Sequence, residues 1–300
     1  MSFSDIIGNE KVKEILKKTV TSNNILHSYL FLGTEGIGKN LFANEFAKMI
    51  LCSDVTKPCN KCKSCLEFQN SNNPDFMTVT NEEKSIKIEQ IRMMQQRISE
   101  KPIVSDRKVY IINNSDTMTT ESQNCLLKTL EEPPEYATII LIASNENKLL
   151  PTIRSRCIKI NFNRLTDDEI LKYVQSNMTD EITPNMISFC GGSLGKALRI
   201  KEEKENYINL EELINQMDKK DLVYILNHAE VLYKSKEIIN DLLEYMNVLL
   251  LKTKEIQKIN CVKYVEETKK RLLSNSNYDM TIDNLLMKTW EEMNEKYNRC

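Results

Sequence analysis

Three short stretches of the chain are almost continuously apolar and rich in β-branched or aromatic residues. They cover residues 28–32 (SYLFL), 108–112 (KVYII) and 137–144 (ATIILIAS). Continuous apolar runs, unlike alternating ones, are typical of strands that are buried on both faces by helices. The pattern therefore predicts an α/β domain with a parallel sheet.

Helical patterns lie between these strands. In residues 40–52 (NLFANEFAKMILC), Phe42, Phe46 and Ile50 recur at helical spacing, and residues 121–134 (ESQNCLLKTLEEPP) form a second pattern that two prolines stop. Strands that alternate with helices support the α/β assignment. We expect this domain to cover residues 1–163.

The remainder of the chain is helical in pattern. Residues 166–177 (TDDEILKYVQSN) begin with Thr166 as a helix cap and an acidic first turn, which predicts a small helical domain over 164–208. In residues 237–252 (EIINDLLEYMNVLLLK), the apolar positions share one broad face, as in the core of a helix bundle. We expect this helical domain to cover 209–300.

Composition narrows the class of protein without assigning a function. The chain of 300 residues is 41% hydrophobic and 28% charged, as in ordinary globular proteins, and its net charge of −2 gives no general attraction to nucleic acid. The first residues lack a signal-peptide pattern, and the apolar runs are too short to span a bilayer. We expect a cytoplasmic protein without membrane contact.

A glycine-rich loop follows the first predicted strand, in the segment YLFLGTEGIGKN. Gly33, Gly38 and Lys39 match the phosphate-loop pattern G-x-x-x-x-G-K-[ST], but Asn40 replaces the hydroxyl residue that would bind magnesium. Backbone N–H groups at the start of a helix and a lysine charge attract phosphate. The segment predicts a degenerate nucleotide site rather than an ordinary tight turn.

Four cysteines lie close together in residues 52–65 (CSDVTKPCNKCKSC). Cys52, Cys59, Cys62 and Cys65 have the spacing C-x6-C-x2-C-x2-C, and such tight turns let thiolates converge on one zinc ion. An iron–sulfur cluster fits less well, because the x3-C-P continuation of a ferredoxin run is absent. Unrelated surface or core cysteines are the other alternative. Four protein ligands leave no open position, so we expect a structural Zn²⁺.

Four motifs occur together in this chain: the phosphate loop preceded by His27, the four-cysteine insert, LLKTLEEPP at 126–134 and IRSRC at 153–157. With these motifs, the first two hundred residues resemble the bacterial DNA polymerase III clamp-loader family, of the AAA+ class. The start of the chain, MSFSDIIGNEKVKEIL, is most similar to the delta-prime type of subunit. The resemblance implies an AAA+ P-loop domain with a zinc-binding insert, then a helical lid domain and a helical bundle, or collar, domain for oligomerisation.

Several positions depart from the pattern of active family members. ATP hydrolysis requires magnesium held by the loop hydroxyl and by an aspartate after a second strand, with a glutamate to orient water. Here Asn113 and Asn114 follow KVYII, Asp116 lies past the strand end, and Gly195 occupies the position that resembles a nucleotide-sensing arginine. Together with the loop asparagine, these departures imply that the chain does not hydrolyse ATP and binds it weakly or not at all.

Arg156, in the SRC motif, resembles the arginine finger that reaches the γ-phosphate on the next AAA+ subunit. Arg154 is the better candidate for a structural salt bridge. The resemblance thus implies a delta-prime-like stator that lends Arg156 to a tau/gamma motor subunit and helps to hold the delta subunit. Through the complex, it would support ATP-driven loading of the sliding clamp on primed DNA during replication.

Two other functions remain open. The chain is an active tau/gamma-like clamp-loader ATPase if the asparagines suffice as magnesium ligands. Alternatively, it is a zinc-dependent DNA-binding module in which Lys57, Lys61 and Lys63 contact phosphates. ATP turnover by the isolated chain separates the first function from the stator, and salt-dependent DNA affinity separates the second.

Overall fold

The computed structural model describes residues 3–81, 84–177, 182–252, 255–274 and 276–294. It divides into two compact units, one of Met1–Glu169 with Gly192–Gly195 and the other of Ile170–Gly191 with Lys196–Cys300. The division into three domains, with boundaries at 163 and 208, stays a prediction.

Five parallel strands form one sheet in the order β2-β3-β4-β1-β5. The strands are β1 (Ser28–Leu32), β2 (Phe76–Val79), β3 (Lys108–Ile112), β4 (Ala137–Ala143) and β5 (Ile158–Asn161). The three predicted strands are β1, β3 and β4, which are buried at every position. β2 and β5 are short edge strands with exposed positions, and the sequence patterns did not predict them. The predicted parallel sheet is confirmed.

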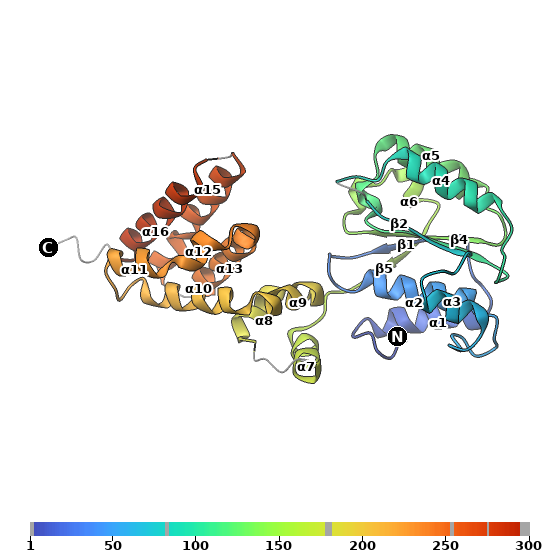
Figure 1. Ribbon diagram of the computed structural model, residues 1–300, viewed down its shortest axis with the longest axis horizontal. Coiled ribbons are helices and arrows are strands. Elements are labelled where there is room, and N and C mark those ends of the chain that lie inside the picture. The colour runs from blue at the N-terminus through green and yellow to red at the C-terminus, as the bar shows by residue number, and fades with distance from the viewer. Residues whose placement is uncertain (1–2, 82–83, 178–181, 253–254, 275, 295–300) are drawn as a thin grey trace. The chain divides into compact units, whose positions relative to one another are not determined.

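Helices cover both faces of the sheet (Figure 1). One face carries α1 (Glu10–Thr21) and α2 (Lys39–Leu51), with α3 (Lys63–Gln69) beside α2; the other carries α4 (Ile88–Ser99), α5 (Thr120–Glu131) and α6 (Pro151–Arg154). Successive side chains of a strand point to opposite faces. Phe31 therefore belongs to the core under α2, whereas Leu30 belongs to the core under α5. Both cores need apolar side chains, which explains the continuous apolar runs.

The second unit is helical, and no described helix of the chain is long and apolar enough to cross a membrane. After α7 (Asp167–Asn177), its helices are α8 (Pro184–Cys190), α9 (Leu194–Glu202), α10 (Lys204–Gln216), α11 (Leu222–His228), α12 (Glu230–Lys234), α13 (Ile239–Lys252), α14 (Ile256–Asn260), α15 (Val262–Leu273) and α16 (Tyr278–Asn294). The predicted apolar face of α13 is buried and packs against α10 and α15. The predicted cap at Thr166 is also present, because its hydroxyl accepts the backbone N–H of Glu169.

Candidate metal and nucleotide sites

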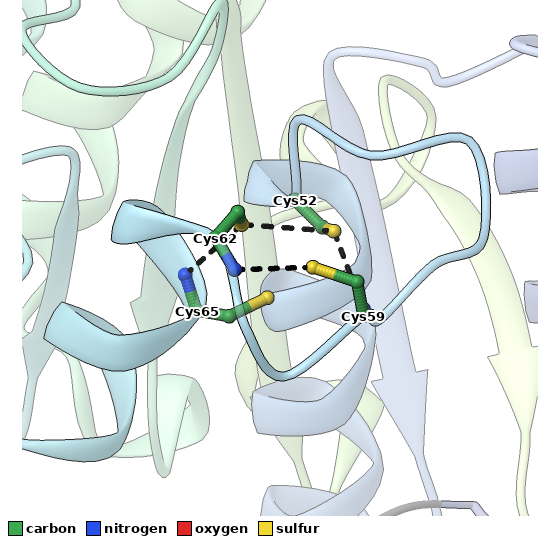
Figure 2. A group of neighbouring side chains, drawn as sticks. All are labelled: Cys52, Cys59, Cys62 and Cys65. Atoms are coloured by element: carbon green, nitrogen blue, oxygen red, sulfur yellow. Dashed lines mark hydrogen bonds between the residues drawn. The ribbon is translucent and has the colours of Figure 1, made fainter.

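The structure brings the four predicted metal ligands together (Figure 2). Cys52 directly follows the last residue of α2, Cys59 lies in the loop, and Cys62 and Cys65 lie at the start of α3. All four sulfur atoms lie within 4.8 Å of one another, and the Sγ atoms of Cys52 and Cys62 are 3.9 Å apart. Four sulfurs at Zn–S bonds of ~2.3 Å in a tetrahedron are about 3.8 Å apart. The cluster therefore fits a zinc ion.

Backbone hydrogen bonds already orient three of these sulfurs. The N–H groups of Cys59, Cys62 and Cys65 donate to Cys52, Cys59 and Cys62, at N···S distances of 3.4, 3.3 and 3.5 Å. Burial raises the pKa of the Cys52 and Cys65 thiols. Burial also acts on Cys62, but hydrogen bonds from Cys65 and Ser53 outweigh it and lower the pKa of its thiol to about 6. Cys62 therefore becomes a thiolate at lower pH than Cys52 and Cys65.

A buried carboxylate holds the loop of residues 103–105, which contacts α3 through Ser105. Asp75, just before β2, is 1% exposed and accepts the backbone N–H groups of Ile103, Val104 and Ser105 at 2.8, 2.7 and 2.7 Å. A carboxylate that accepts several backbone donors is a strong, charge-assisted anchor. Asp75 therefore fixes the conformation of residues 103–105.

This loop in turn ties the cysteine segment to the α/β core. The hydroxyl oxygen of Ser105 lies 2.9 Å from both the Leu51 carbonyl oxygen and the hydroxyl oxygen of Ser64, which sits between two of the metal ligands. The Asn73 side chain donates to the Ser64 carbonyl and hydroxyl oxygens at 3.0 Å each. Hydrogen bonds among these polar groups thus connect the cysteine segment to the residues before β2 and β3.

The lysines considered for DNA contact lie around the same segment. Lys61 and Lys63 are exposed, and Lys57 is half-buried. Lys63 lies 3.9 Å from Glu67 on α3, so an acidic partner reduces its local positive charge. This arrangement does not by itself favour a phosphate-binding surface.

The phosphate loop joins β1 to α2, as predicted, with Gly38 in the left-handed region (φ 92°) before the first helical residue, Lys39. Lys39 is 7% exposed, and its ammonium donates to the carbonyl oxygens of Gly33 and Thr34 at 2.6 and 2.7 Å. Burial lowers the pKa of Lys39, while the charges of Asp116 and Glu35 oppose that effect. The ammonium group that would bind phosphate thus donates its hydrogen bonds to the loop itself.

Asn40 is also engaged within its own helix. Its side-chain oxygen accepts a hydrogen bond from Asn44 at 3.1 Å, and its carbonyl oxygen accepts another at 2.8 Å. These contacts add to the difference between Asn40 and a loop hydroxyl.

The two asparagines after β3 make local hydrogen bonds at the carboxyl ends of the strands, where the phosphate loop also lies. The Asn113 side chain accepts the Asn114 backbone N–H at 3.1 Å, and the Asn114 side chain donates to Asn81 at 3.3 Å. Asp116 lies past the strand end in a short 3₁₀ turn, where it accepts the backbone N–H groups of Ser144 and Asn145 at 3.3 and 3.0 Å. Its carboxylate thus holds the end of β4.

Gly195 contacts the phosphate loop directly. Its backbone N–H donates to the carbonyl oxygen of Gly36 at 2.9 Å, and a Cβ atom at Gly195 would lie 3.0 Å from the Gly36 Cα. An arginine at this position would require the backbone to move apart. The close approach accounts for glycine where the resemblance places a sensing arginine.

Arg156 lies between α6 and β5, at the amino ends of the parallel strands, whereas the phosphate loop lies at their carboxyl ends. Its guanidinium pairs with Glu131 at 2.7 Å and donates to the Thr152 carbonyl oxygen at 2.9 Å. Among the described residues, the salt bridge expected for Arg154 is formed by Arg156 instead, with Glu131 at the end of α5. The Nε atom of Arg154 is buried without a hydrogen-bond partner among the residues that the structure describes.

Sequence patterns missed several residues that shape these sites. Ser144 lies 3.3 Å from the Lys39 ammonium, and its place directly after β4, the neighbour of β1, was a usable signal. Glu131 was visible within the LEEPP motif. The pairing of Ser64 with Ser105 had no sequence signal, because the two serines are far apart along the chain.

Comparisons with known proteins identify relatives of this chain. Residues 8–166 match the family described as "DNA polymerase III, delta subunit". The chain is 34% identical over 185 residues to the DNA polymerase III subunit tau/gamma of Haemophilus influenzae, with 61% of this chain and 27% of that protein covered. It is 27% identical over 311 residues to the DNA polymerase III subunit delta' of Bacillus subtilis, with 92% and 94% covered.

A solved structure shares the fold. The gamma subunit-related protein of Thermotoga maritima superposes with a TM-score of 0.51 at 18% identity, over 95% of this chain and 99% of that one. The chain spans less than two thirds of the tau and gamma relatives that it matches, but the family match covers more than half of the chain. The chain therefore belongs to the DNA polymerase III clamp-loader family.

Proposed function

We propose that the chain is a delta-prime-like stator of the clamp loader, which does not hydrolyse ATP and lends Arg156 to an adjacent tau/gamma subunit. The extent of the alignments supports this assignment. The match to the Bacillus subtilis delta' subunit covers 94% of that protein, whereas the match to the Haemophilus influenzae tau/gamma subunit covers 27%. Sequence identity to the two kinds of subunit is similar, so the residues of the sites carry the rest of the proposal.

The single observation that carries the proposal is the contrast between the residues at the carboxyl ends and those at the amino ends of the strands. At the carboxyl ends, amides replace the magnesium ligands, and the carbonyl oxygens of Gly33 and Thr34 accept hydrogen bonds from Lys39. At the amino ends, Arg156 is retained, and its side chain is 35% exposed. A chain that has lost the groups that act on its own nucleotide but keeps one that acts on a neighbour's nucleotide fits a supporting subunit.

In this role, the positively charged guanidinium of Arg156 would stabilise charge that develops on the nucleotide bound to the neighbouring subunit. Such an arginine finger is worth ~10³–10⁵ in rate in nucleotide hydrolases. The four cysteines would hold a structural Zn²⁺, because all four ligand positions are filled by protein sulfur. The delta subunit, the sliding clamp and primed DNA are the expected partners through the complex, and the second unit would contain the lid and the collar.

ATP hydrolysis tests the proposal. Steady-state turnover is measured for the chain alone and for the chain mixed with its tau/gamma and delta subunits, sliding clamp and primed DNA. We expect no turnover by the chain alone. We also expect stimulated turnover in the mixture, reduced by about 10³-fold at the affected site with Arg156→Ala.

Lys159→Ala is the matched control, because Lys159 lies three residues away and forms an exposed pair with Glu146 at 2.8 Å. It should leave stimulation unchanged. Robust turnover by the isolated chain would instead assign an active tau/gamma-like ATPase. Unchanged stimulation with Arg156→Ala would remove the role of this arginine.

A further inference from the structure

Lys48 is a buried lysine that the proposed function does not use. It lies in the last turn of α2 and is 4% exposed. Its ammonium donates to the side-chain oxygen of Asn60 at 2.5 Å. Lysine is almost never fully buried unless it is paired, because removing its charge from water is costly. Within the described part of the chain, no ion pair involves Lys48, and the neutral amide of Asn60 does not balance its charge.

The partner of Lys48 belongs to the turn that carries two of the metal ligands. Asn60 directly follows Cys59 and precedes Cys62 by two residues, and its backbone is in the left-handed region (φ 59°). The side-chain amide of Gln69 also reaches the same oxygen, at 3.4 Å. The hydrogen bond from Lys48 thus restrains the turn that points these sulfurs into the cluster.

The backbone of Lys48 also contacts a third metal ligand, Cys52, which directly follows α2. Its carbonyl oxygen accepts the backbone N–H of Cys52 at 3.1 Å, which ends the helix at the first cysteine. One residue therefore contacts both chain segments that deliver ligands from outside α3.

We propose that Lys48 is a positioning residue of the zinc site, which orients the Asn60 turn between Cys59 and Cys62. The proposal requires that the cysteines hold zinc, and it does not depend on the stator function. Residues outside the ligand shell of a metal commonly change its affinity by about 10–100-fold.

Glu45 offers a competing explanation for the buried charge. It lies one turn earlier on α2, is 5% exposed, and its Oε1 atom has no hydrogen-bond partner among the described residues. Burial raises the pKa of Glu45, and the charge of Lys48 opposes that rise. If Lys48 served only to balance Glu45, its removal would not affect the metal once Glu45 is neutral.

Zinc affinity measured by competition with a chromogenic chelator tests the proposal in the full chain. The variants are Lys48→Met, Lys48→Arg, Glu45→Gln and the double variant Glu45→Gln/Lys48→Met. We expect Lys48→Met to weaken zinc binding by about 10–100-fold, Lys48→Arg to recover most of the loss, and the double variant to keep it. With Co²⁺ in place of Zn²⁺, the thiolate charge-transfer bands of Lys48→Met should shift, which a loss of folding stability alone would not cause.

Asn60→Gly provides a second measurement that does not depend on how well Lys48→Met folds. Glycine keeps the left-handed turn but removes the acceptor, so a loss of zinc affinity smaller than that of Lys48→Met is expected. Wild-type zinc affinity in both Lys48→Met and Asn60→Gly would overturn the proposal. A loss that disappears in the Glu45→Gln background would also overturn it, in favour of a pair between Lys48 and Glu45.

Discussion

The hydroxyl of Ser28 donates a hydrogen bond to the carbonyl oxygen of Arg156 at 2.6 Å. Ser28 is the first residue of β1, whereas Gly33 follows the last. A strand of this length separates the two points by about 16 Å, at ~3.3 Å per residue. The arginine and the phosphate loop of this chain therefore lie at opposite ends of the strands. This separation favours action of Arg156 on a neighbouring subunit rather than on its own loop.

The ion pair between Arg156 and Glu131 predicts a positioning role for this glutamate. Both side chains are partly exposed, so the pair contributes at most ~1 kcal/mol. We expect Glu131→Gln to lower the stimulated ATPase of the reconstituted clamp loader by about fivefold or less, far below the effect of Arg156→Ala.

Glu132→Gln is the control for this prediction, since Glu132 is the exposed neighbour of Glu131 and forms none of the ion pairs found among the described residues. A loss with Glu131→Gln as large as that with Arg156→Ala would show that the glutamate does more than hold the guanidinium.

Zinc affinity should depend on pH in a defined direction. Zinc binds thiolates, and burial raises the pKa of the Cys52 and Cys65 thiols, so metal binding at neutral pH releases protons. Affinity should rise with pH by up to about tenfold per unit for each proton released. Cys62, whose pKa is lowered to about 6, should steepen the dependence only below that pH.

Chelator competition at a series of pH values measures this dependence. Cys62→Ser should lower bound zinc below one ion per chain, whereas Cys125→Ser, outside the cluster, should leave zinc binding unchanged. A pH-independent affinity, or full metal content in Cys62→Ser, would contradict a four-thiolate site.

The contact of Gly195 with Gly36 makes a prediction about stability whose sign is informative. Replacing glycine by alanine within a helix normally stabilises a protein by about 0.5–1 kcal/mol. At Gly195 the new Cβ would lie 3.0 Å from a backbone atom of the phosphate loop, so we expect destabilisation of ~1–3 kcal/mol and a lower midpoint of thermal unfolding.

Arg199→Ala, at an exposed position of the same helix, should change the unfolding midpoint little. An increased midpoint for Gly195→Ala would mean that residues 192–195, which include the start of α9, move away from the phosphate loop at little cost.

Asp75→Asn should destabilise the chain through the loop that supports the cysteine segment. The substitution replaces one acceptor oxygen with a donor and leaves at least one of the three partly buried backbone N–H groups without this partner, at a cost of ~1–3 kcal/mol. Thermal unfolding measures the effect, with Asp106→Asn as the control at an exposed position close to the same loop. Equal unfolding midpoints for the two variants would disprove the anchoring role.

Apolar runs alone located β1, β3 and β4, because a strand covered on both faces needs apolar residues at every position. They did not reveal β2 and β5, whose edge positions tolerate exposed side chains such as Lys159. Local spacing also identified the phosphate loop and the four cysteines, since neighbouring ligands come from tight turns that a short sequence encodes.

Contacts between distant segments were decided by the tertiary structure. The choice of Arg156 over Arg154 as the partner of Glu131 depends on how α5 packs beside α6. The ties of Ser105 to Ser64 and of Lys48 to Asn60 likewise depend on which buried polar groups meet after folding. A buried donor must find an acceptor, but its position along the chain does not say which one. Sequence thus determined the kinds of site, and packing determined the residues that hold them in place.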